Sequence, residues 1–201
     1  MRVERITVGP FQTNCYIVET GGNCYIVDPG GDIHIILEKL KNLECEPTAI
    51  IATHAHFDHV LGVKDLKIQL EIPFIMHAAD LPILLGQPEF VRNFWGFELP
   101  NLIDRVDRFV DEGDRLNSDL VVMHTPGHSP GSISLVGNGF LITGDVIFKD
   151  GYGRTDLPGG DTKLLARSIE RILSFDDKTL IYPGHGPVTT VGECARKLFF
   201  R

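Results

Sequence analysis

The sequence of 201 residues predicts a layered α/β fold, with mixed sheets inside and helices outside. Apolar runs of strand length alternate along the chain with segments whose apolar residues recur at helical spacing. Hairpin turns and longer crossovers both connect these segments, and this combination predicts mixed rather than purely parallel sheets. No long linker interrupts the pattern, so we expect one domain over residues 1–201.

The first half of the chain begins with a hairpin, in which two Tyr-Ile-Val strands flank the turn Gly21-Gly22-Asn23. Asp32 stands at the start of a segment with helical periodicity that continues to Leu43, and we expect it to cap that helix. The other elements expected here are a buried strand over 48–53, a helix over 60–70, a strand over 73–76 and a helix from about Ala78.

The second half repeats this alternation after an aromatic-rich stretch over 86–101, which we expect to be irregular. Asp161 directly precedes a segment of helical periodicity and is expected to cap it. The elements expected in this half are strands over 120–124, 132–136, 139–143 and 179–182, and helices over 162–173 and from Val191.

Composition and charge argue against several functions. The 27 acidic and 19 basic residues give a net charge of −8 without an offsetting basic run, so we expect no nucleic-acid partner. No apolar run approaches the roughly eighteen residues that span a bilayer, and the first residues lack a signal-peptide core; we therefore expect a cytoplasmic protein with no membrane partner. The four cysteines are scattered without a Cys-x-x-Cys pair, which predicts buried thiols rather than disulfides or a thiolate zinc site.

The hexapeptide His54-Ala55-His56-Phe57-Asp58-His59 directly follows the apolar run 49–52 and is the most informative segment of the chain. Burying three imidazoles and a carboxylate together is costly unless a partner compensates, and a divalent metal ion is the usual partner. The alternative is a solvated loop that carries these four polar side chains by chance.

Three other predicted strands run directly through a glycine into a His or Asp, at Pro126-Gly127-His128, Gly144-Asp145 and Pro183-Gly184-His185. Ligands gather outside the carboxyl ends of strands in α/β proteins, so we expect these turns and the hexapeptide to form one site. Its candidate metal ligands are His54, His56, Asp58, His59, His128, Asp145 and His185.

The number and type of these ligands predict two metal ions. Structural zinc uses four ligands and favours cysteine. Seven nitrogen and oxygen ligands instead suit two ions about 3.5–4 Å apart that share a carboxylate and a hydroxide. The remaining histidines, His34, His77 and His124, are interpreted as structural residues or as supports for the ligands.

These motifs resemble those of the metallo-β-lactamase superfamily, and more narrowly of its glyoxalase II-like (hydroxyacylglutathione hydrolase-like) branch. The resemblance covers essentially the whole chain and extends to Ser129-Pro130-Gly131-Ser132. The stretch over 153–160, Gly-Arg-Thr-Asp-Leu-Pro-Gly-Gly, is similar to the short bacterial or archaeal type of that branch. The resemblance implies an αββα sandwich, with two mixed sheets flanked by helices and a dinuclear metal site at the strand ends.

The resemblance also implies two groups of ligands, with Asp145 bridging them. The groups are His54, His56 and His128 for one ion, and Asp58, His59 and His185 for the other. The ions would be zinc, with iron or manganese as alternatives, and would supply a hydroxide as the nucleophile, with Asp58 and Asp145 as the catalytic carboxylates. β-Lactamases proper resemble the chain less well, because they typically place a cysteine at the position of Asp145.

The implied reaction is hydrolysis of a small-molecule thioester such as S-lactoylglutathione. A thiolate whose conjugate thiol has a pKa of about 8.5 leaves without much help from a general acid, and the motifs contain no spare acid. Typical glyoxalase II enzymes carry a carboxy-terminal helical domain that helps to bind glutathione. Only 16 residues follow His185, so we expect no such domain and do not carry over glutathione recognition.

The strongest alternative is a persulfide dioxygenase of the same superfamily, which Gly153-Arg154-Thr155-Asp156 also resembles. It would hold a single iron ion on His54, His128 and Asp145, so the number of bound ions separates the two hypotheses. A lactonase, a phosphodiesterase acting on nucleic acid and a non-catalytic metal-binding protein rank lower. The acidic balance disfavours the phosphodiesterase, and the ligand count disfavours the non-catalytic protein.

Substrate contacts are expected after the bridging carboxylate, where Tyr152 and Arg154 are candidates for hydrogen bonds to a substrate carboxylate. The alternative for Arg154 is an ion pair with Asp156 that holds its own loop. The aromatic segment 90–95 forms either a lid over the site or part of the packing around the sheets. The sequence predicts no particular oligomeric state.

Overall fold

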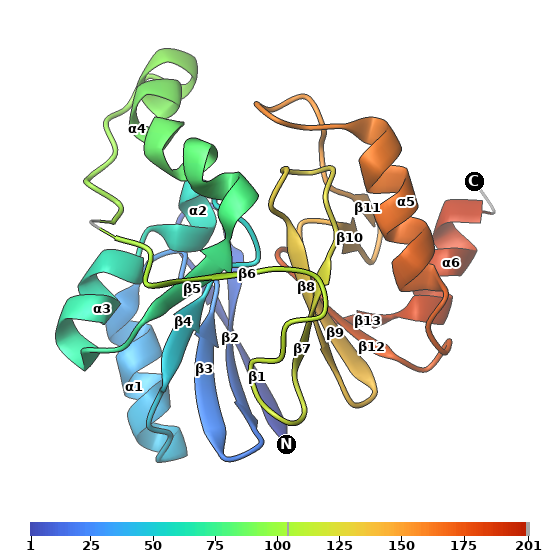
Figure 1. Cartoon of the computed structure of the whole chain (residues 1–201), viewed down its shortest axis with the longest axis horizontal. Helices are drawn as coiled ribbons and strands as arrows, with labels where there is room; N and C mark the ends of the chain where they lie inside the picture. The colour runs from blue at the N-terminus through green and yellow to red at the C-terminus, as the bar shows by residue number, and fades with distance from the viewer. Residues whose placement is uncertain (104, 200–201) are drawn as a thin grey trace.

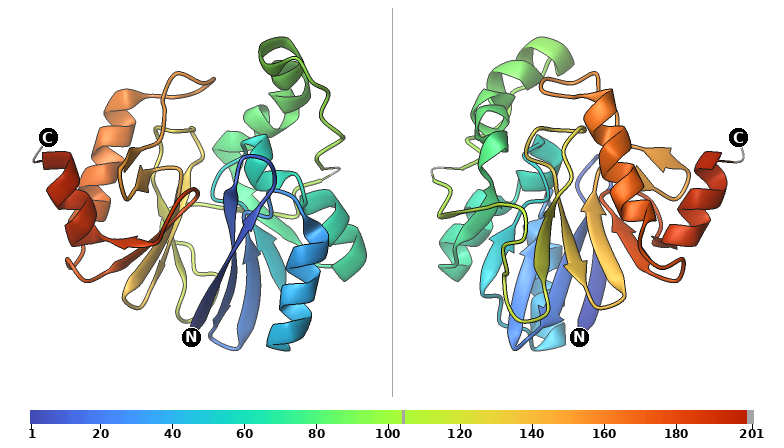
Figure 2. Two further views of the ribbon diagram at one scale, coloured as in Figure 1. Left: turned by 180° about the vertical axis from the view of Figure 1, so that it is seen from behind. Right: turned by 45° about the vertical axis from the view of Figure 1, so that its right-hand side comes forward.

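The computed structural model describes residues 1–103 and 105–199, and it shows two mixed sheets packed face to face with helices on both outer sides (Figure 1). This arrangement is the predicted αββα sandwich. The first half of the chain forms one sheet with its helices, and the second half forms the other, as Figure 2 shows from two further sides. In the described part of the chain, no helix has the length and apolar character needed to cross a membrane.

The first sheet has six strands, of which the first three are antiparallel and the following ones parallel. In their order across the sheet they are β1 (Arg2–Val8), β2 (Thr13–Thr20), β3 (Asn23–Val27), β4 (Ala49–Ile51), β5 (Phe74–His77) and β6 (Arg108–Val110). The helices of this half are α1 (Ile33–Leu43), α2 (Phe57–Val60), α3 (Val63–Leu70), the short 3-10 helix η1 (Ala78–Asp80) and α4 (Leu81–Trp95).

The second sheet has five strands and is also mixed. In their order across the sheet they are β13 (Thr189–Thr190), β12 (Leu180–Pro183), β9 (Phe140–Gly144), β8 (Ile133–Gly137) and β7 (Val121–His124), with the parallel pair between β12 and β9. A separate ribbon pairs β10 (Ile147–Phe148) with β11 (Gly151–Tyr152). Two helices cover the outer face, α5 (Thr162–Leu173) and α6 (Val191–Phe199).

Three apolar layers hold the sandwich together. Strand side chains alternate between the two faces of a sheet, and in β2 this alternation sends Tyr16 and Val18 into the layer between the sheets. Cys15 and Ile17 of the same strand join the layer beneath α1 to α4. A third layer lies between the second sheet and the helices α5 and α6. Central strands such as β2 and β4 are therefore buried on both faces, as the apolar runs predicted.

Hydrogen bonds join the two sheets at the edge where strands end in His or Asp. The Tyr16 hydroxyl donates to the Pro183 carbonyl at 2.6 Å, and the Asn14 backbone N–H donates to the Gly184 carbonyl at 2.7 Å. On the other side, the Ile133 N–H donates to the Thr53 carbonyl at 2.8 Å. These bonds fix the relative position of loops that come from different sheets.

The expectation of an irregular segment over 86–101 is wrong for its first ten residues, because α4 continues to Trp95 through Gly86 and Pro88. Leu84 and Val91 anchor the helix by burial in the layer beneath it, and this packing outweighs the local cost of an interior glycine and proline. Strands β1, β6, β10 and β11 are further elements that the periodicity did not predict.

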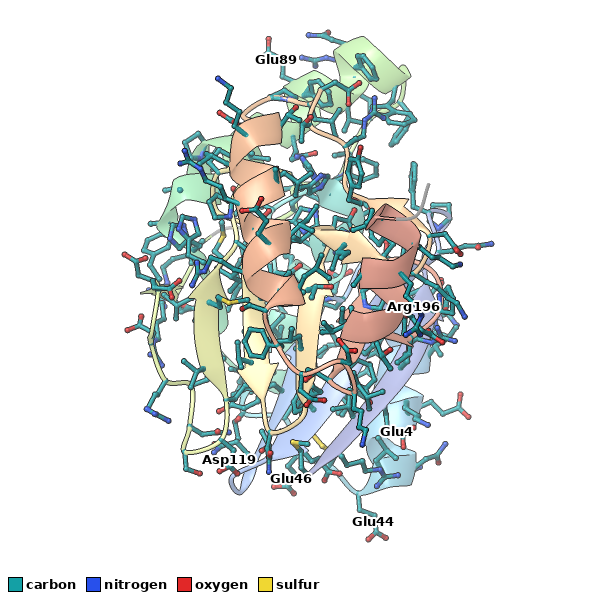
Figure 3. The ribbon with its side chains drawn as sticks, turned by 90° about the vertical axis from the view of Figure 1, so that its right-hand side faces the viewer. Glu4, Glu44, Glu46, Glu89, Asp119 and Arg196 are labelled. Atoms are coloured by element: carbon teal, nitrogen blue, oxygen red, sulfur yellow. A yellow bond between two sulfur atoms is a disulfide. The ribbon has the colours of Figure 1, made fainter. Side chains whose placement is uncertain are left out.

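Two local expectations about the cysteines and the caps need correction. Cys24 and Cys45 form a disulfide, because β3 and the end of α1 bring their Cα atoms to 6.4 Å, a proximity that local spacing does not show. Figure 3 draws its sulfur–sulfur bond in yellow, at the end of the molecule where Glu46 is labelled. Asp32 occupies the N-cap position, but its carboxylate accepts a bond from the Gly9 N–H instead of capping the helix.

Other expectations of this kind are confirmed. Asp161 caps α5, since its carboxylate accepts bonds from the Lys163 and Leu164 N–H groups at 2.8 and 2.9 Å. Cys15 and Cys194 are buried free thiols.

Candidate metal centre

All seven predicted ligands lie together at one edge of the sandwich. The hexapeptide follows β4 and continues into α2, and the other three ligands follow β7, β9 and β12. Within this set, three groups of three side chains have ligand atoms within 4.8 Å of one another. The groups are His54 with His56 and His128, His54 with His59 and Asp145, and Asp58 with His59 and His185.

The first group consists of three buried imidazoles, His54, His56 and His128. The nitrogens His56 Nδ1 and His128 Nε2 lie 2.8 Å apart. The rings meet edge to face, at interplanar angles of 79 to 90°, rather than in stacks. In this orientation their nitrogens point toward a common position, which suits a metal ion.

The second group combines a carboxylate with two imidazoles. Asp58 Oδ2 lies 3.3 Å from His185 Nε2 and 3.6 Å from His59 Nε2. His59 is completely buried, whereas His185 is partly exposed and leaves this group open to solvent. The group therefore has both a fixed inner ligand and an accessible outer one.

Asp145 lies between the two groups. Its Oδ1 atom is 3.5 Å from His59 Nε2, and its Oδ2 atom is 3.7 Å from His128 Nε2 and 3.5 Å from His185 Nε2. One carboxylate thus faces ligands of both groups, and this is the geometry that a bridging ligand requires.

The hydrogen bonding of the cluster fits bound cations. Three buried atoms have no hydrogen-bond partner among the described residues, namely His54 Nε2, His59 Nε2 and Asp145 Oδ1. Buried polar atoms almost always have a partner, and a cation between these nitrogens and carboxylates would supply it. Each of the three belongs to a group whose geometry suits a metal, so the residues present fit the ions that the sequence predicts.

Electrostatics also favour positive charge at this position. Burial alone would lower the pKa of His59, but the carboxylates of Asp58, Asp145 and Asp28 outweigh it and raise this pKa to about 10. Burial works against ionisation of Asp58 as well, but the rings of His59 and His185 hold its pKa below the usual range. The Asp58 carboxylate therefore stays ionised and attracts a cation.

In the first group, His54 and His56 stay neutral. Burial lowers the pKa of His54 well below its ordinary value, and it lowers the pKa of His56 to about 3. Neutral imidazole is the form that binds metals. Both side chains are therefore ready to act as ligands across the neutral pH range.

Hydrogen bonds on the side away from the centre orient the ligand side chains. Asp28 Oδ2 accepts from His59 Nδ1 at 3.0 Å, which leaves His59 Nε2 free to face the centre. His128 Nδ1 similarly donates to the Arg154 carbonyl at 2.8 Å. The Thr13 hydroxyl donates to Asp58 at 3.2 Å. Asp28, which contacts a predicted ligand, was not assigned from sequence, although it follows a buried strand in the same way as Asp145.

Asp80 ties two of the ligand loops together and was also missed. Its carboxylate accepts bonds from the Ala55 N–H at 2.8 Å, from the Ser129 hydroxyl at 2.7 Å and from the Gly131 N–H at 2.5 Å. Ala55 lies between His54 and His56, and Ser129 follows His128. Burial raises the pKa of Asp80, and the Ser129 bond partly offsets this. No motif surrounds Asp80, so the sequence offers no signal for this role.

Glycines let the loops approach the ligands closely. A Cβ atom at Gly184 would collide with the Asp145 carboxylate and crowd the His59 ring. Gly144 has a φ of 50°, in the left-handed region, and a side chain there would meet Thr53. The glycines of two of the predicted turns are therefore required by the position of Asp145.

The candidate substrate contacts have different surroundings. Arg154 forms a bidentate ion pair with Asp156, at 2.6 and 2.7 Å, which is the alternative that the sequence left open. Tyr152 is exposed in β11, beside a surface hollow that His185 also lines. Neither side chain is brought into the ligand cluster.

The three other histidines lie outside the metal centre. His34 is exposed on α1. His77 and His124 stack face to face, with ring centres 4.2 Å apart, and their ligand atoms lie within 4.8 Å of a carboxylate oxygen of Asp111. We refer to His77, Asp111 and His124 as the outer histidine cluster.

The metal centre opens into a cavity of about 320 Å³. The aromatic side chains of Phe11, Phe57, Phe90 and Trp95 line its outer part, and His56, Asp58, Asp145 and His185 line its base. A small molecule can therefore reach the ligands from solvent past an apolar wall.

Comparisons with known proteins agree with this geometry. The family model described as the metallo-beta-lactamase superfamily matches residues 8–185. The chain is 36% identical to the probable metallo-hydrolase YqgX of Bacillus subtilis, over 95% of this chain and 93% of that protein. It is 34% identical to the hydroxyacylglutathione hydrolase GloC of Haemophilus influenzae, over 96% and 94% of the two chains.

A solved structure is similar over the whole chain. The crystal structure of TTHA1623 in a di-iron-bound form superposes with a TM-score of 0.92 at 40% identity, and the match covers 99% of this chain and 100% of that one. The family model, the two relatives and this structure all agree with the family resemblance that we described from the strand-end motifs. The chain belongs to the metallo-beta-lactamase superfamily, in its glyoxalase II-like branch of metallo-hydrolases.

Proposed function

We propose that this chain is a thioester hydrolase of glyoxalase II type that binds two divalent metal ions. The observation that carries the proposal is the position of Asp145, whose two carboxylate oxygens face ligands of both groups. The similarity to the hydrolase GloC supports the reaction class. We propose zinc as the metal, and the di-iron form of TTHA1623 makes iron the alternative.

The second group of ligands favours this hypothesis over a single-iron dioxygenase. A facial triad needs two histidines and one carboxylate, which His54, His128 and Asp145 would satisfy alone. The structure also gathers Asp58, His59 and His185, and an atom of His59 is buried without a partner. A mononuclear site would leave that atom unexplained.

Two divalent ions, when bound, lower the pKa of a shared water toward neutrality and polarise the carbonyl oxygen of the substrate. Asp58 and Asp145 each place a carboxylate oxygen within 3.5 Å of His185 Nε2, and they are proposed to orient the attacking water by accepting its hydrogen bonds. Water adds to the carbonyl carbon, the carbon–sulfur bond breaks, and a carboxylic acid and a thiol are formed. The thiolate leaves without a general acid, because the conjugate thiol has a pKa of only about 8.5.

The test measures metal content and thiol release on one preparation of the full chain. We expect about two metal ions per chain, and thiol release from S-lactoylglutathione and from simple acyl thioesters. Asp145→Ala should abolish thiol release and lower the metal content, while the circular dichroism of the fold is retained. Arg115→Ala serves as the matched control and should leave both values unchanged, because Arg115 is exposed and pairs with the start of β7, at the end opposite to His128.

One iron per chain, together with oxygen consumed in step with glutathione persulfide, would refute the hydrolase and establish the dioxygenase. Two metal ions without thiol release from any thioester would refute the substrate class but keep the dinuclear centre.

A further inference from the structure

A second and larger cavity, of about 640 Å³, lies beside the metal centre. It is formed between the two halves of the molecule, by α4 on one side and by Pro130, Pro158 and Gly159 on the other. Figures 1 and 2 show the loop before α5 reaching toward α4 at this end of the sandwich. Its volume lies within the range of small-molecule sites, which is roughly 300–1,000 Å³.

This cavity is continuous with the metal centre, because three residues line both cavities. They are His56, a proposed metal ligand, and Gln87 and Phe90 of α4. A molecule whose reacting carbonyl lies at the metal centre would therefore have direct access to the larger cavity. The shared residues mark the passage between the two.

The lining of the larger cavity is apolar and contains no Lys or Arg among the described residues. Its one carboxylate belongs to Glu89, which is exposed and points outward from α4 in Figure 3. The one Lys or Arg in the described lining of the smaller cavity is Arg154, and Asp156 already pairs with it. This lining suits an uncharged apolar group better than a peptide with free carboxylates.

Gln87 provides a second and independent observation. Its side chain is only 4% exposed, and no described residue forms a hydrogen bond with its carboxamide. Asn14, which is equally buried, has its amide satisfied by the Pro183 and Gly186 carbonyls. The Gln87 carboxamide is not among the fully buried atoms that lack a partner, so it is open to the passage, where a ligand can form hydrogen bonds with it.

We propose that the larger cavity binds the acyl chain of the substrate, and that this chain is uncharged, several carbons long and carries one neutral polar group near the carbonyl. Gln87 is the specificity-determining residue, since its carboxamide hydrogen-bonds that polar group in the passage. The inference rests on the proposed thioester hydrolase and names the class of its substrate. It places the selectivity of the enzyme in the acyl group rather than in the thiol.

The first test compares acyl chains on one small thiol. Thiol release is measured for the acetyl and hexanoyl thioesters of N-acetylcysteamine with the metal-loaded full chain. We expect kcat/KM to be about ten-fold or more higher for the hexanoyl thioester, because each buried methylene adds to binding. Ile83→Trp, which fills the cavity from α4, should lower the hexanoyl value at least about ten-fold more than the acetyl value.

Leu85→Trp is the matched control, because Leu85 lies on the same helix but is 69% exposed and lines neither cavity. This variant should leave the ratio of the two values unchanged. Equal kcat/KM for the two thioesters in the wild type would overturn the inference and leave the proposed hydrolase intact. An equal loss for both thioesters in Ile83→Trp would overturn it too.

The second test addresses Gln87 with the 3-hydroxyhexanoyl thioester. The wild type should prefer it to the hexanoyl thioester, and Gln87→Leu should lower this preference about ten-fold, the cost of a lost hydrogen bond to a buried group. Thermal unfolding of the variant checks that it folds. An unchanged preference in a folded variant would remove Gln87 from the proposal.

A binding measurement separates failure of the cavity from failure of the hydrolase. The ketone analogue, in which a methylene replaces the thioester sulfur, is titrated by calorimetry. Binding that Ile83→Trp weakens about ten-fold while Leu85→Trp does not would support the cavity even if no thioester were hydrolysed. Absence of binding to the wild type would overturn the inference.

Discussion

The candidate metal centre and the outer histidine cluster contain the same kinds of side chain within the same distance of one another. In both places, imidazole and carboxylate ligand atoms lie within 4.8 Å. They differ in what else these atoms contact. The metal centre contains three buried atoms without a partner, whereas three of the four ring nitrogens of the outer histidine cluster have a hydrogen-bond partner in the protein.

The hydrogen bonds of the outer histidine cluster already use most of its ring nitrogens. His77 Nδ1 accepts the Ala79 N–H at 3.1 Å, so the ring proton must lie on Nε2, which faces Asp111 at 3.4 Å. His124 Nε2 donates to the Pro130 carbonyl at 2.8 Å. The two rings stack at an angle of 11°, so their nitrogens do not converge on one position.

This comparison shows that proximity of His and Asp is not enough to identify a metal site. The distinguishing property is a set of buried nitrogen and oxygen atoms that have no hydrogen-bond partner in the protein and face one common position. Such a set is costly for the folded chain unless a cation binds, and conversely a cluster whose atoms are satisfied gains little from an ion.

The largest expected effect comes from removing one imidazole in each place. His54→Ala should lower kcat/KM for thioester hydrolysis by about a thousand-fold or more, because loss of an ion removes several kcal/mol of charge stabilisation. His77→Ala should change kcat/KM by less than about three-fold and leave the metal content as it was. Steady-state kinetics and metal analysis on both variants measure this difference. Loss of metal from His77→Ala would contradict the distinction between the two clusters.

Metal removal tests the same contrast through stability. A ligand at a thousand times its Kd stabilises the folded state by about 4 kcal/mol, which corresponds to about 8–16 °C in Tm for a chain of this size. We expect chelation to lower the Tm of the wild type and of a His77→Ala/His124→Ala double variant by the same amount. Calorimetry of loaded and chelated protein gives both shifts. If chelation does not change the Tm, this result would argue against bound ions at the candidate metal centre.

The sequence predicted that the seven candidate ligand side chains lie together, because strand direction is a backbone property that local sequence pattern indicates. Four apolar runs ended in His or Asp, and parallel or mixed sheets bring such ends to one edge. Asp28 directly follows β3 and fits the same rule, but it was not among the candidate ligands, and its bond to His59 was missed.

Features that depend on distant contacts were not accessible in this way. The disulfide joins Cys24 to Cys45 across 21 positions, and only the return of α1 along β3 makes it possible. The helix α4 carries Gly86 and Pro88, which locally favour a loop, and only the apolar layer below Leu84 and Val91 keeps it helical. Without that helix, neither the larger cavity nor Gln87 could be placed.

Asp80 connects the two clusters and gives the smallest of these effects. His77 caps the start of η1, and Asp80 ends the same short helix with three bonds to the loops of His54, His56 and His128. Asp80, rather than the outer histidine cluster, therefore connects η1 to the metal-ligand loops. Asp80→Asn keeps the volume but replaces one acceptor oxygen by a donor, so one of the three bonds must break.

We expect Asp80→Asn to lower metal affinity or kcat/KM by about 10-fold to 100-fold, the usual effect of losing a bond that orients metal ligands. Competition with a chelating dye measures the affinity, and Asp111→Asn, at the exposed edge of the outer histidine cluster, is the matched control with no expected change. A merely structural role would lower the Tm of Asp80→Asn without changing the affinity of the protein that remains folded. Weaker binding in the folded variant instead identifies Asp80 as a positioning residue, which acts on the metal ligands through its bonds to Ala55, Ser129 and Gly131.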